Sequence, residues 1–221
     1  MTIAAIITAA GTSSRFGSGT KKEFCTLNDK PVLYYAALPF VQDPRISRIV
    51  VTYPAEQLKP MQDCLKDLDT TQIEYCEGGE NRRISVFNAL KCLEKGISPD
   101  YVLIHDGARP FLTNELLGKC IQVTVESGAC VPALTITDAL KKTSNGMITE
   151  HLNRNEYCTV QTPQGFRYLP LLEKHKNACN NPKEYHDDTE IYGMDSSAIT
   201  IIPGDPANIK ITFRGDLEKH K

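Results

Sequence analysis

The sequence predicts an α/β fold with three layers, in which helices cover both faces of a mostly parallel, Rossmann-like sheet. Short apolar runs alternate along the chain with segments of helical pattern, which is the order of β–α–β units. Several of these runs are apolar nearly throughout, as in strands that are buried on both faces. The expected strands are residues 3–7, 46–53, 73–76, 101–104, 129–134 and 199–202.

The expected helices fill the gaps between these strands. Pro31 suits the first turn of a helix, where its missing N–H leaves no hydrogen bond unmade. A typical domain has ~150 residues, so the chain of 221 residues predicts one domain, residues 1–221, with an appendage. The expected helices are residues 31–41, 56–68, 80–95 and 114–127.

The appendage is the segment of residues 137–155, TDALKKTSNGMITEHLNRN. Its Asn145-Gly146 pair is a strong signal for a two-residue hairpin turn. The segment has few large apolar side chains, so it cannot bury itself well. We expect a projecting β-hairpin arm that packs on something else, such as a second subunit; a plain surface hairpin is the alternative.

Composition and charge exclude several classes of protein. The net charge is 25 − 27 = −2, which argues against nucleic acid or an anionic membrane as a partner. The apolar opening, residues 3–10, is far shorter than the ~20 residues of a membrane span, and no basic residue precedes it as in a signal peptide. The eight cysteines form no CxxC pair, so we expect reduced thiols in a cytoplasmic protein.

The loop after the first strand, residues 9–17 (AAGTSSRFG), is the first segment that can carry chemistry. Its small residues let the backbone approach a ligand closely, and turn N–H groups can hold phosphate oxygens. The loop matches neither the dinucleotide GxGxxG pattern nor the Walker loop. With Arg15 and Lys22 nearby, it predicts a triphosphate site with cationic clamps; a solvated basic loop is the alternative.

A glycine pair follows the third expected strand, in residues 77–86 (EGGENRRISV). It stands at the start of an expected helix, where backbone groups and the Ser85 hydroxyl can read the edge of a base. A simple connecting loop would have the same pattern.

Residues 105–110 (HDGARP) lie just past an expected strand, where ligands of open α/β sheets bind. In that position Asp106 can serve a metal or sugar hydroxyls, and Arg109 can bind a phosphate through two N–H groups. An internal ion pair between the two is the alternative.

The last third of the chain carries scattered polar residues. Arg154 stands at the base of the arm, and Lys210 stands between two isoleucines. On a strand Lys210 would point away from them, either to solvent or into the site. Asp187 and Asp188 can cap a short helix, or they can take part in the site.

Taken in order, several segments resemble the 2-C-methyl-D-erythritol 4-phosphate cytidylyltransferase family of the non-mevalonate isoprenoid pathway, from about Ala4 to Asp216. They are AAGTSSRFG…KKEF, GGENRRISV, HDGARPF, TPQGF, HDD and GDPANIKIT. The resemblance implies a nucleotidyltransferase-type fold, CTP as a substrate with Mg²⁺, and a polyol phosphate as acceptor. It also implies a homodimer in which each arm serves the neighbouring site.

The resemblance further implies roles for the residues that match the family motifs. The residues that would bind CTP are Ala9, Ala10, Gly11, Gly79, Glu80 and Ser85. The residues that would act in catalysis are Arg15, Lys22, Arg154 and Lys210. The residues that would bind the acceptor are Asp106, Arg109 and Asp187. No general base is expected, because a phosphate monoester is already an anionic nucleophile, and His105 is expected to be structural.

Two positions depart from the family pattern. Ala139 stands where a threonine hydroxyl would contact the substrate phosphate, and His186 stands where a threonine often precedes the acidic pair. Both lie on the acceptor side. A ribitol 5-phosphate cytidylyltransferase is therefore the alternative enzyme, and a non-catalytic nucleotide-binding module is the alternative of another class.

Overall fold

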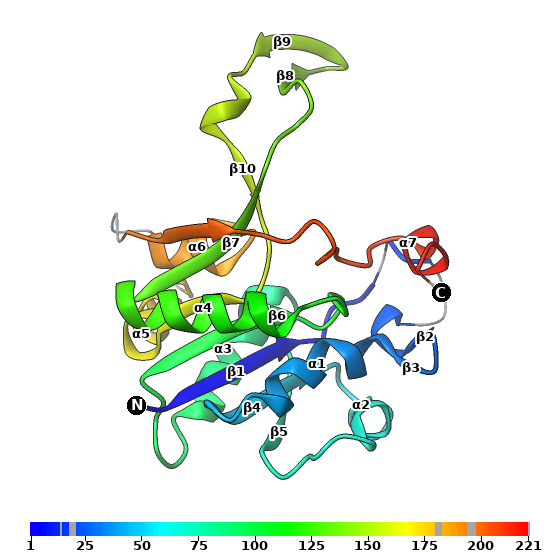
Figure 1. Ribbon diagram of the computed structural model, residues 1–221, viewed down its shortest axis with the longest axis vertical. Coiled ribbons are helices and arrows are strands. Elements are labelled where there is room, and N and C mark those ends of the chain that lie inside the picture. The colour runs from blue at the N-terminus through cyan, green and yellow to red at the C-terminus, as the bar shows by residue number, and fades with distance from the viewer. Residues whose placement is uncertain (14, 18–20, 180–182, 194–197, 221) are drawn as a thin grey trace.

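The computed structural model describes residues 1–13, 15–17, 21–179, 183–193 and 198–220 (Figure 1). Ser14 of the small-residue loop lies outside the described residues. Helices cover both faces of one large sheet, so the expected α/β fold with three layers is confirmed. No helix among the described residues has both the length and the apolar character needed to cross a membrane.

The large sheet has eight strands and is mostly parallel. Its strands are β1 (Ile3–Thr8), β4 (Ile46–Tyr53), β5 (Ile73–Glu77), β6 (Tyr101–Asp106), β7 (Ala129–Thr135), β10 (Cys158–Val160), β11 (Gln164–Arg167) and β12 (Thr200–Pro203). Their order is β10-β7-β11-β6-β1-β4-β5, and β12 pairs with β7. Strands β6, β1, β4 and β5 run parallel to one another, whereas β11 runs antiparallel to both β6 and β7.

The remaining elements are seven α-helices, two 3₁₀ helices and two small hairpins among the described residues. The α-helices are α1 (Val32–Gln42), α2 (Leu58–Leu65), α3 (Arg82–Leu93), α4 (Asn114–Ser127), α5 (Tyr168–Ala178), α6 (Asp188–Tyr192) and α7 (Arg214–Glu218). The others are η1 (Lys22–Phe24), η2 (Arg154–Glu156), β2 (Thr26–Leu27), β3 (Lys30–Pro31), β8 (Lys141–Ser144) and β9 (Met147–His151).

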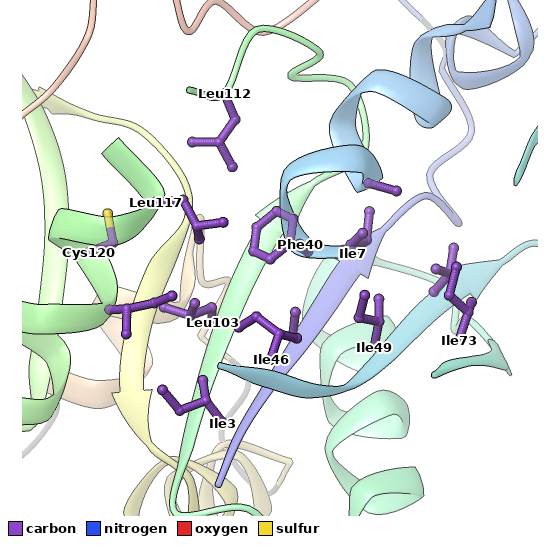
Figure 2. Close-up of a cluster of buried hydrophobic side chains, with 14 of the residues drawn as sticks. Ile3, Ile7, Phe40, Ile46, Ile49, Ile73, Leu103, Leu112, Leu117 and Cys120 are labelled. Atoms are coloured by element: carbon purple, nitrogen blue, oxygen red, sulfur yellow. The ribbon is translucent and has the colours of Figure 1, made fainter. Parts of the chain in front are cut away.

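The central strand β1 is buried on both faces because each face of the sheet has its own core. Ile3, Ala5 and Ile7 point into a cluster with α1, α2 and α4, where Figure 2 shows Ile7 beside Phe40. Ala4 and Ile6 point to the other face, against α3 and α5. The alternation of a strand thus explains why an apolar run without polar breaks forms the middle layer.

The four expected helices are present, and the helix expected at residues 114–127 has those bounds. The helix expected at 56–68 is shorter, Leu58–Leu65. Strands β10 and β11 and helix α5 were not expected, whereas α6 begins at the acidic pair that the sequence offered as the cap of a short helix. Strand β11 begins with Gln164-Gly165 and therefore has no apolar run; pairing with β6 and β7 on its two sides fixes it as a strand.

The predicted hairpin arm is confirmed as β8 paired with β9. Its turn has Asn145 at φ 49° and Gly146 at φ 76°, the positive values that a type I′ turn requires. Every residue of β9 is exposed, including Met147 and Ile148. Figure 1 shows the arm extending away from the sheet, beyond the end of β7.

Gly165 of β11 packs directly against α4, and we predict that Gly165→Ala destabilises the fold. A Cβ at this position would lie 1.9 Å from Thr124 Oγ1 and 2.9 Å from its Cβ, so strand and helix would have to separate. We expect a loss of ~1–3 kcal/mol in the free energy of unfolding, measured by urea denaturation.

Gly118→Ala is the matched control for that variant. Gly118 lies within α4, and a Cβ there would meet only the Arg45 guanidinium, at 3.4 Å. Alanine is favoured over glycine inside a helix by ~0.5–1 kcal/mol, so this variant should gain stability. Equal effects of the two variants would contradict the close packing of Gly165.

Candidate active site

Two hollows open at the carboxyl ends of β1 and β6. The first has a volume of about 330 Å³ and is lined by the small-residue loop with Arg15 and Lys22. The second, of about 430 Å³, is lined by Arg109 and by residues of the segments before β11 and α6. The four residues that line both hollows are Arg82, Asp106, His186 and Lys210. The two hollows therefore share a charged wall.

The small-residue loop packs so closely against the glycine pair that no space remains for a side chain at Gly78. A Cβ on Gly78 would lie 2.2 Å from the Cβ of Ala10, so glycine is needed there. The Ser85 hydroxyl donates to Asn81 O at 2.9 Å and accepts from the Gly79 N–H at 3.1 Å. These contacts hold the start of α3 against the first hollow, where Ala10 and Ser85 both line the wall.

Lys22 and Arg15 line the same hollow. Lys22 begins the short helix η1, and burial lowers the pKa of its ammonium group. The next residue, Glu23, is 3% exposed and accepts a hydrogen bond from Ser13 Oγ at 3.2 Å. The loop and η1 are thus tied together, which fixes two cations beside the hollow.

Asp106, the last residue of β6, is surrounded by three cations. Its carboxylate lies 2.8 Å from Lys210 Nζ, 3.4 Å from Arg82 Nε and 3.6 Å from Arg109 Nε. Burial alone would raise the pKa of Asp106, but the three cations hold it well below its usual range. The group is therefore a carboxylate at neutral pH, and each cation keeps a face toward a hollow.

The segment that carries Lys210 is held by hydrogen bonds to the loop after β6. The Ile211 N–H donates to Ala108 O at 2.8 Å, and Arg109 Nη1 donates to Asn208 O at 2.7 Å. The residues around Lys210 form neither helix nor strand, so strand geometry does not set the direction of the Lys210 side chain. The side chain points into the site because these bonds, and its ion pair with Asp106, orient it.

Asp187 lies in the second hollow and is also the N-cap of α6. One carboxylate oxygen accepts from the Glu190 N–H at 3.1 Å and from Thr189 Oγ1 at 2.6 Å. The other accepts from Gln164 Nε2 at 2.9 Å. The capping role expected for this acidic pair is confirmed at Asp187.

The IspD: 2-C-methyl-D-erythritol 4-phosphate cytidylyltransferase family model matches residues 3–220. This chain belongs to that family. A 2-C-methyl-D-erythritol 4-phosphate cytidylyltransferase of Clostridium tetani is 35% identical over 96% of this chain and 86% of its own length. A crystal structure of 4-diphosphocytidyl-2C-methyl-D-erythritol synthase from Anaerococcus prevotii has a TM-score of 0.87 at 25% identity, covering 99% of this chain and 94% of that chain.

Some relatives of this IspD-family chain are longer. A bifunctional enzyme IspD/IspF of Bartonella tribocorum is 37% identical over 99% of this chain but only 55% of its own length. The chain thus spans about half the length of these bifunctional relatives.

The structure brings most of the candidate residues of this IspD-family chain to the two hollows. Those in the linings are Ala10, Gly11, Arg15, Lys22, Ser85, Asp106, Arg109, Asp187 and Lys210. Those outside both linings are Ala9, Gly79, Glu80 and Arg154. Ala9 is buried beneath the loop, with its N–H donating to Thr52 Oγ1 at 3.0 Å. Arg154 is exposed at the base of the arm, where it donates to Thr137 O.

Arg82 is not among the residues that the sequence motifs predict for the site, yet its side chain lies in the shared wall between Asp106 and Asp188. The signal was its position at the first residue of the helix that follows the glycine pair. His186, noted only as a departure from the family pattern, also lines both hollows.

The shared wall does not suit a metal held by protein ligands alone. No group of three or more His, Cys, Asp or Glu side chains that could hold a metal ion occurs in the described part of the chain. The wall that the two hollows share holds one carboxylate, Asp106, beside the cations Arg82 and Lys210. This donor set fits a nucleotide that arrives with Mg²⁺ on its own phosphates.

His105 is buried in the strand just before Asp106, and its ring holds two segments together. Nδ1 lies 2.9 Å from Thr162 Oγ1, and Nε2 lies 3.1 Å from Arg109 O. The ring has 0% exposure and lines neither hollow. This geometry supports the structural role expected for His105.

We predict that His105 makes stability depend on pH. Burial lowers the pKa of His105 to about 4, whereas an unfolded chain takes up the proton near pH ~6.5. The unfolded state then binds more protons between these values, so stability is complete above pH ~6.5 and falls as the pH drops toward 4, by roughly 3 kcal/mol in all. Urea unfolding of the wild type and His105→Gln from pH 7.5 to 4.5 measures this. The same decline in both proteins would contradict the assignment.

Proposed function

We propose that this protein transfers a cytidylyl group from CTP to 2-C-methyl-D-erythritol 4-phosphate and releases pyrophosphate. The observation that carries the proposal is the wall shared by the two hollows, with Lys210 reaching both. One hollow is lined by the small-residue loop and the other by Arg109. Membership of the cytidylyltransferase family supports the same reaction.

The proposed reaction is a direct displacement. An oxygen of the acceptor phosphate forms a bond to the α-phosphorus of CTP as the bond from that phosphorus to the β-phosphate bridging oxygen breaks. Pyrophosphate then leaves with the electron pair of the broken bond. The acceptor carries no proton that must be removed first, so positioning and charge stabilisation supply the catalysis.

Cations are needed because two polyanions must meet. Two like charges ~4 Å apart repel by ~4 kcal/mol at the effective dielectric near a protein surface. We assign Arg15 and Lys22 to the developing charge at the α-phosphorus and Lys210 to the attacking phosphate. Asp106 would accept hydrogen bonds from acceptor hydroxyls, with Arg109 and Asp187 beside it.

On the CTP side, we assign the loop of Ala9, Ala10 and Gly11 to the triphosphate. Ser85 lies against the first hollow and would meet the base and ribose together with Gly79 and Glu80. The Mg²⁺ that accompanies CTP would supply Lewis-acid neutralisation of the phosphate charge.

We further propose a homodimer that forms through the arm. Arg154 lies in the arm's base and lines neither hollow of its own chain. An arm with exposed Met147 and Ile148 needs a covering surface, and a second copy would bring Arg154 to the neighbouring acceptor site. The cysteines form no CxxC pair, which supports a reducing compartment, and we propose the cytoplasm.

The decisive experiment is pyrophosphate release from CTP and Mg²⁺ with three acceptor conditions. The proposal expects release with 2-C-methyl-D-erythritol 4-phosphate and none without an acceptor. Release with ribitol 5-phosphate alone would assign the alternative activity and point to Ala139 and His186 as the specificity change. No release with either acceptor, with CTP still bound, would favour a nucleotide-binding module.

Lys22→Ala tests the catalytic cation. We expect kcat to fall by ~10²-fold or more, because a fixed charge at the developing phosphorane is lost, while the circular dichroism spectrum stays native. Lys30→Ala is the matched control: it removes a nearby lysine that pairs with Asp67 and lines neither hollow, so it should keep wild-type activity. Full activity of Lys22→Ala would remove this residue from the mechanism.

Mixing two inactive variants tests the arm. Arg154→Ala and Lys22→Ala homodimers should each be inactive, because each lacks one cation in both sites. Heterodimers that form by subunit exchange would contain one site with both cations. Random exchange of an equal mixture makes about half of the dimers heterodimers, so mixing should restore activity toward about a quarter of wild type. Failure to restore activity, with exchange verified by differently tagged chains, would contradict an arm that acts on the neighbour.

A further inference from the structure

A continuous chain of polar side chains runs from the interior of the protein to the shared wall. His175 Nε2 lies 3.1 Å from Asp188 Oδ1, and Asp188 Oδ2 lies 2.6 Å from Arg82 Nη1. Arg82 Nε in turn lies 3.4 Å from Asp106 Oδ1. The chain joins α5, α6, α3 and the end of β6, and only its last two members line the hollows.

The inner end of this chain is fully buried. The side chains of His175 and Asp188 are both 0% exposed, whereas that of Arg82 is 26% exposed. Burial would raise the pKa of Asp188, but Arg82 and then His175 lower it below its usual value, so the group is ionised. A buried ion pair seldom gives the most stable core. Apolar residues of the same volume pack as well, and their burial does not remove water from charged groups.

Asp188 and Asp106 compete for the same guanidinium. The 2.6 Å contact to Asp188 is a short charge-assisted hydrogen bond, whereas the 3.4 Å approach to Asp106 is long. Arg82 is thus held mainly by Asp188 and touches Asp106 only weakly. Without this hold, Arg82 would be free to form a closer contact with Asp106 Oδ1.

His175 supports Asp188 through one ring nitrogen. An ionised carboxylate only accepts hydrogen bonds, so Nε2 carries the proton and donates to Asp188. Nδ1 is buried and has no hydrogen-bond partner in the part of the chain that the structure describes. The ring stacks parallel to Phe87, with centroids 6.2 Å apart, so the ring plane and the direction of Nε2 are fixed.

We propose that Asp188 and His175 are positioning residues of the reaction. They keep Arg82 from closing further on Asp106, so that the Asp106 carboxylate remains able to bind the acceptor. This inference rests on the proposed function for its kinetic consequence. Its structural consequence, the position of Arg82, does not depend on that function.

Asp188→Asn tests the proposal because it keeps the shape of the side chain and removes the charge. The KM for the acceptor should rise about tenfold, the order of magnitude expected when one hydrogen bond to a charged group is lost. The KM for CTP should stay within about twofold, because the small-residue loop still holds the nucleotide. A merely structural role would lower the active fraction, and so kcat, with both KM values unchanged.

Ile191→Ala is the matched control, since Ile191 lies in the same helix α6, is 1% exposed and belongs to a separate apolar cluster. It should destabilise the protein, as buried large-to-small changes do, and leave the ratio of the two KM values as in the wild type. A rise in acceptor KM in this variant equal to that of Asp188→Asn would overturn the proposal.

A pair of variants at His175 tests which nitrogen matters. The amide nitrogen of His175→Gln reaches the place of Nε2 and can donate to Asp188, so the acceptor KM should stay within about twofold of wild type. The shorter amide of His175→Asn falls near the unpartnered Nδ1 position, so the acceptor KM should rise at least threefold. Equal KM values for these two variants would overturn the role of His175.

A crystal structure of Asp188→Asn separates failure of this inference from failure of the proposed function. We expect Arg82 Nε to move from 3.4 Å to ordinary hydrogen-bond distance from Asp106. An unmoved Arg82 would overturn the proposal even if the enzyme is active. If Arg82 moves in this variant and the wild-type protein has no cytidylyltransferase activity, the positioning role is upheld and the proposed function is rejected.

Discussion

The candidate site depends on one buried carboxylate. Asp106 ends β6 in surroundings that exclude most water, and it stays ionised because Lys210, Arg82 and Arg109 surround it. A buried charge is tolerable only when it is paired and hydrogen-bonded. The three cations come from the start of α3, the loop after β6 and the C-terminal segment. Folding must therefore bring these three segments to the end of β6, and doing so assembles the wall between the two hollows.

The three-layer architecture supplies a rigid base for this cluster. Strands β1 and β6 pair in parallel and have helices packed on both faces, so the positions at their carboxyl ends are set by two cores. His105 extends this rigidity by joining Thr162 and the Arg109 backbone beneath the site. Electrostatic catalysis needs this kind of support, because a cation stabilises a transition state best when it need not reorganise during the reaction.

Many of the strands and the hairpin turn can be predicted from the sequence alone. The runs of β1, β4, β6 and β7 are apolar enough to mark buried strands, and the Asn145-Gly146 turn marks the hairpin. Strand β11 could not be found this way, because its place between β6 and β7 comes from pairing and not from an apolar run. In the site, Arg15, Lys22, Asp106 and Lys210 were all expected, but Arg82 was not, because only its partners reveal its position.

The sequence by itself determined the order of strands and helices, the turn chemistry of the arm and the family motifs, because these depend on residues close together along the chain. Only the tertiary structure decided which charges become neighbours. Arg82 and Asp188 are 106 residues apart in the chain and 2.6 Å apart in space. Electrostatic energy depends on distance in space and on burial, and neither is written in local sequence. The paired hollows and the chain from His175 to Asp106 therefore emerge only when the sheet has formed.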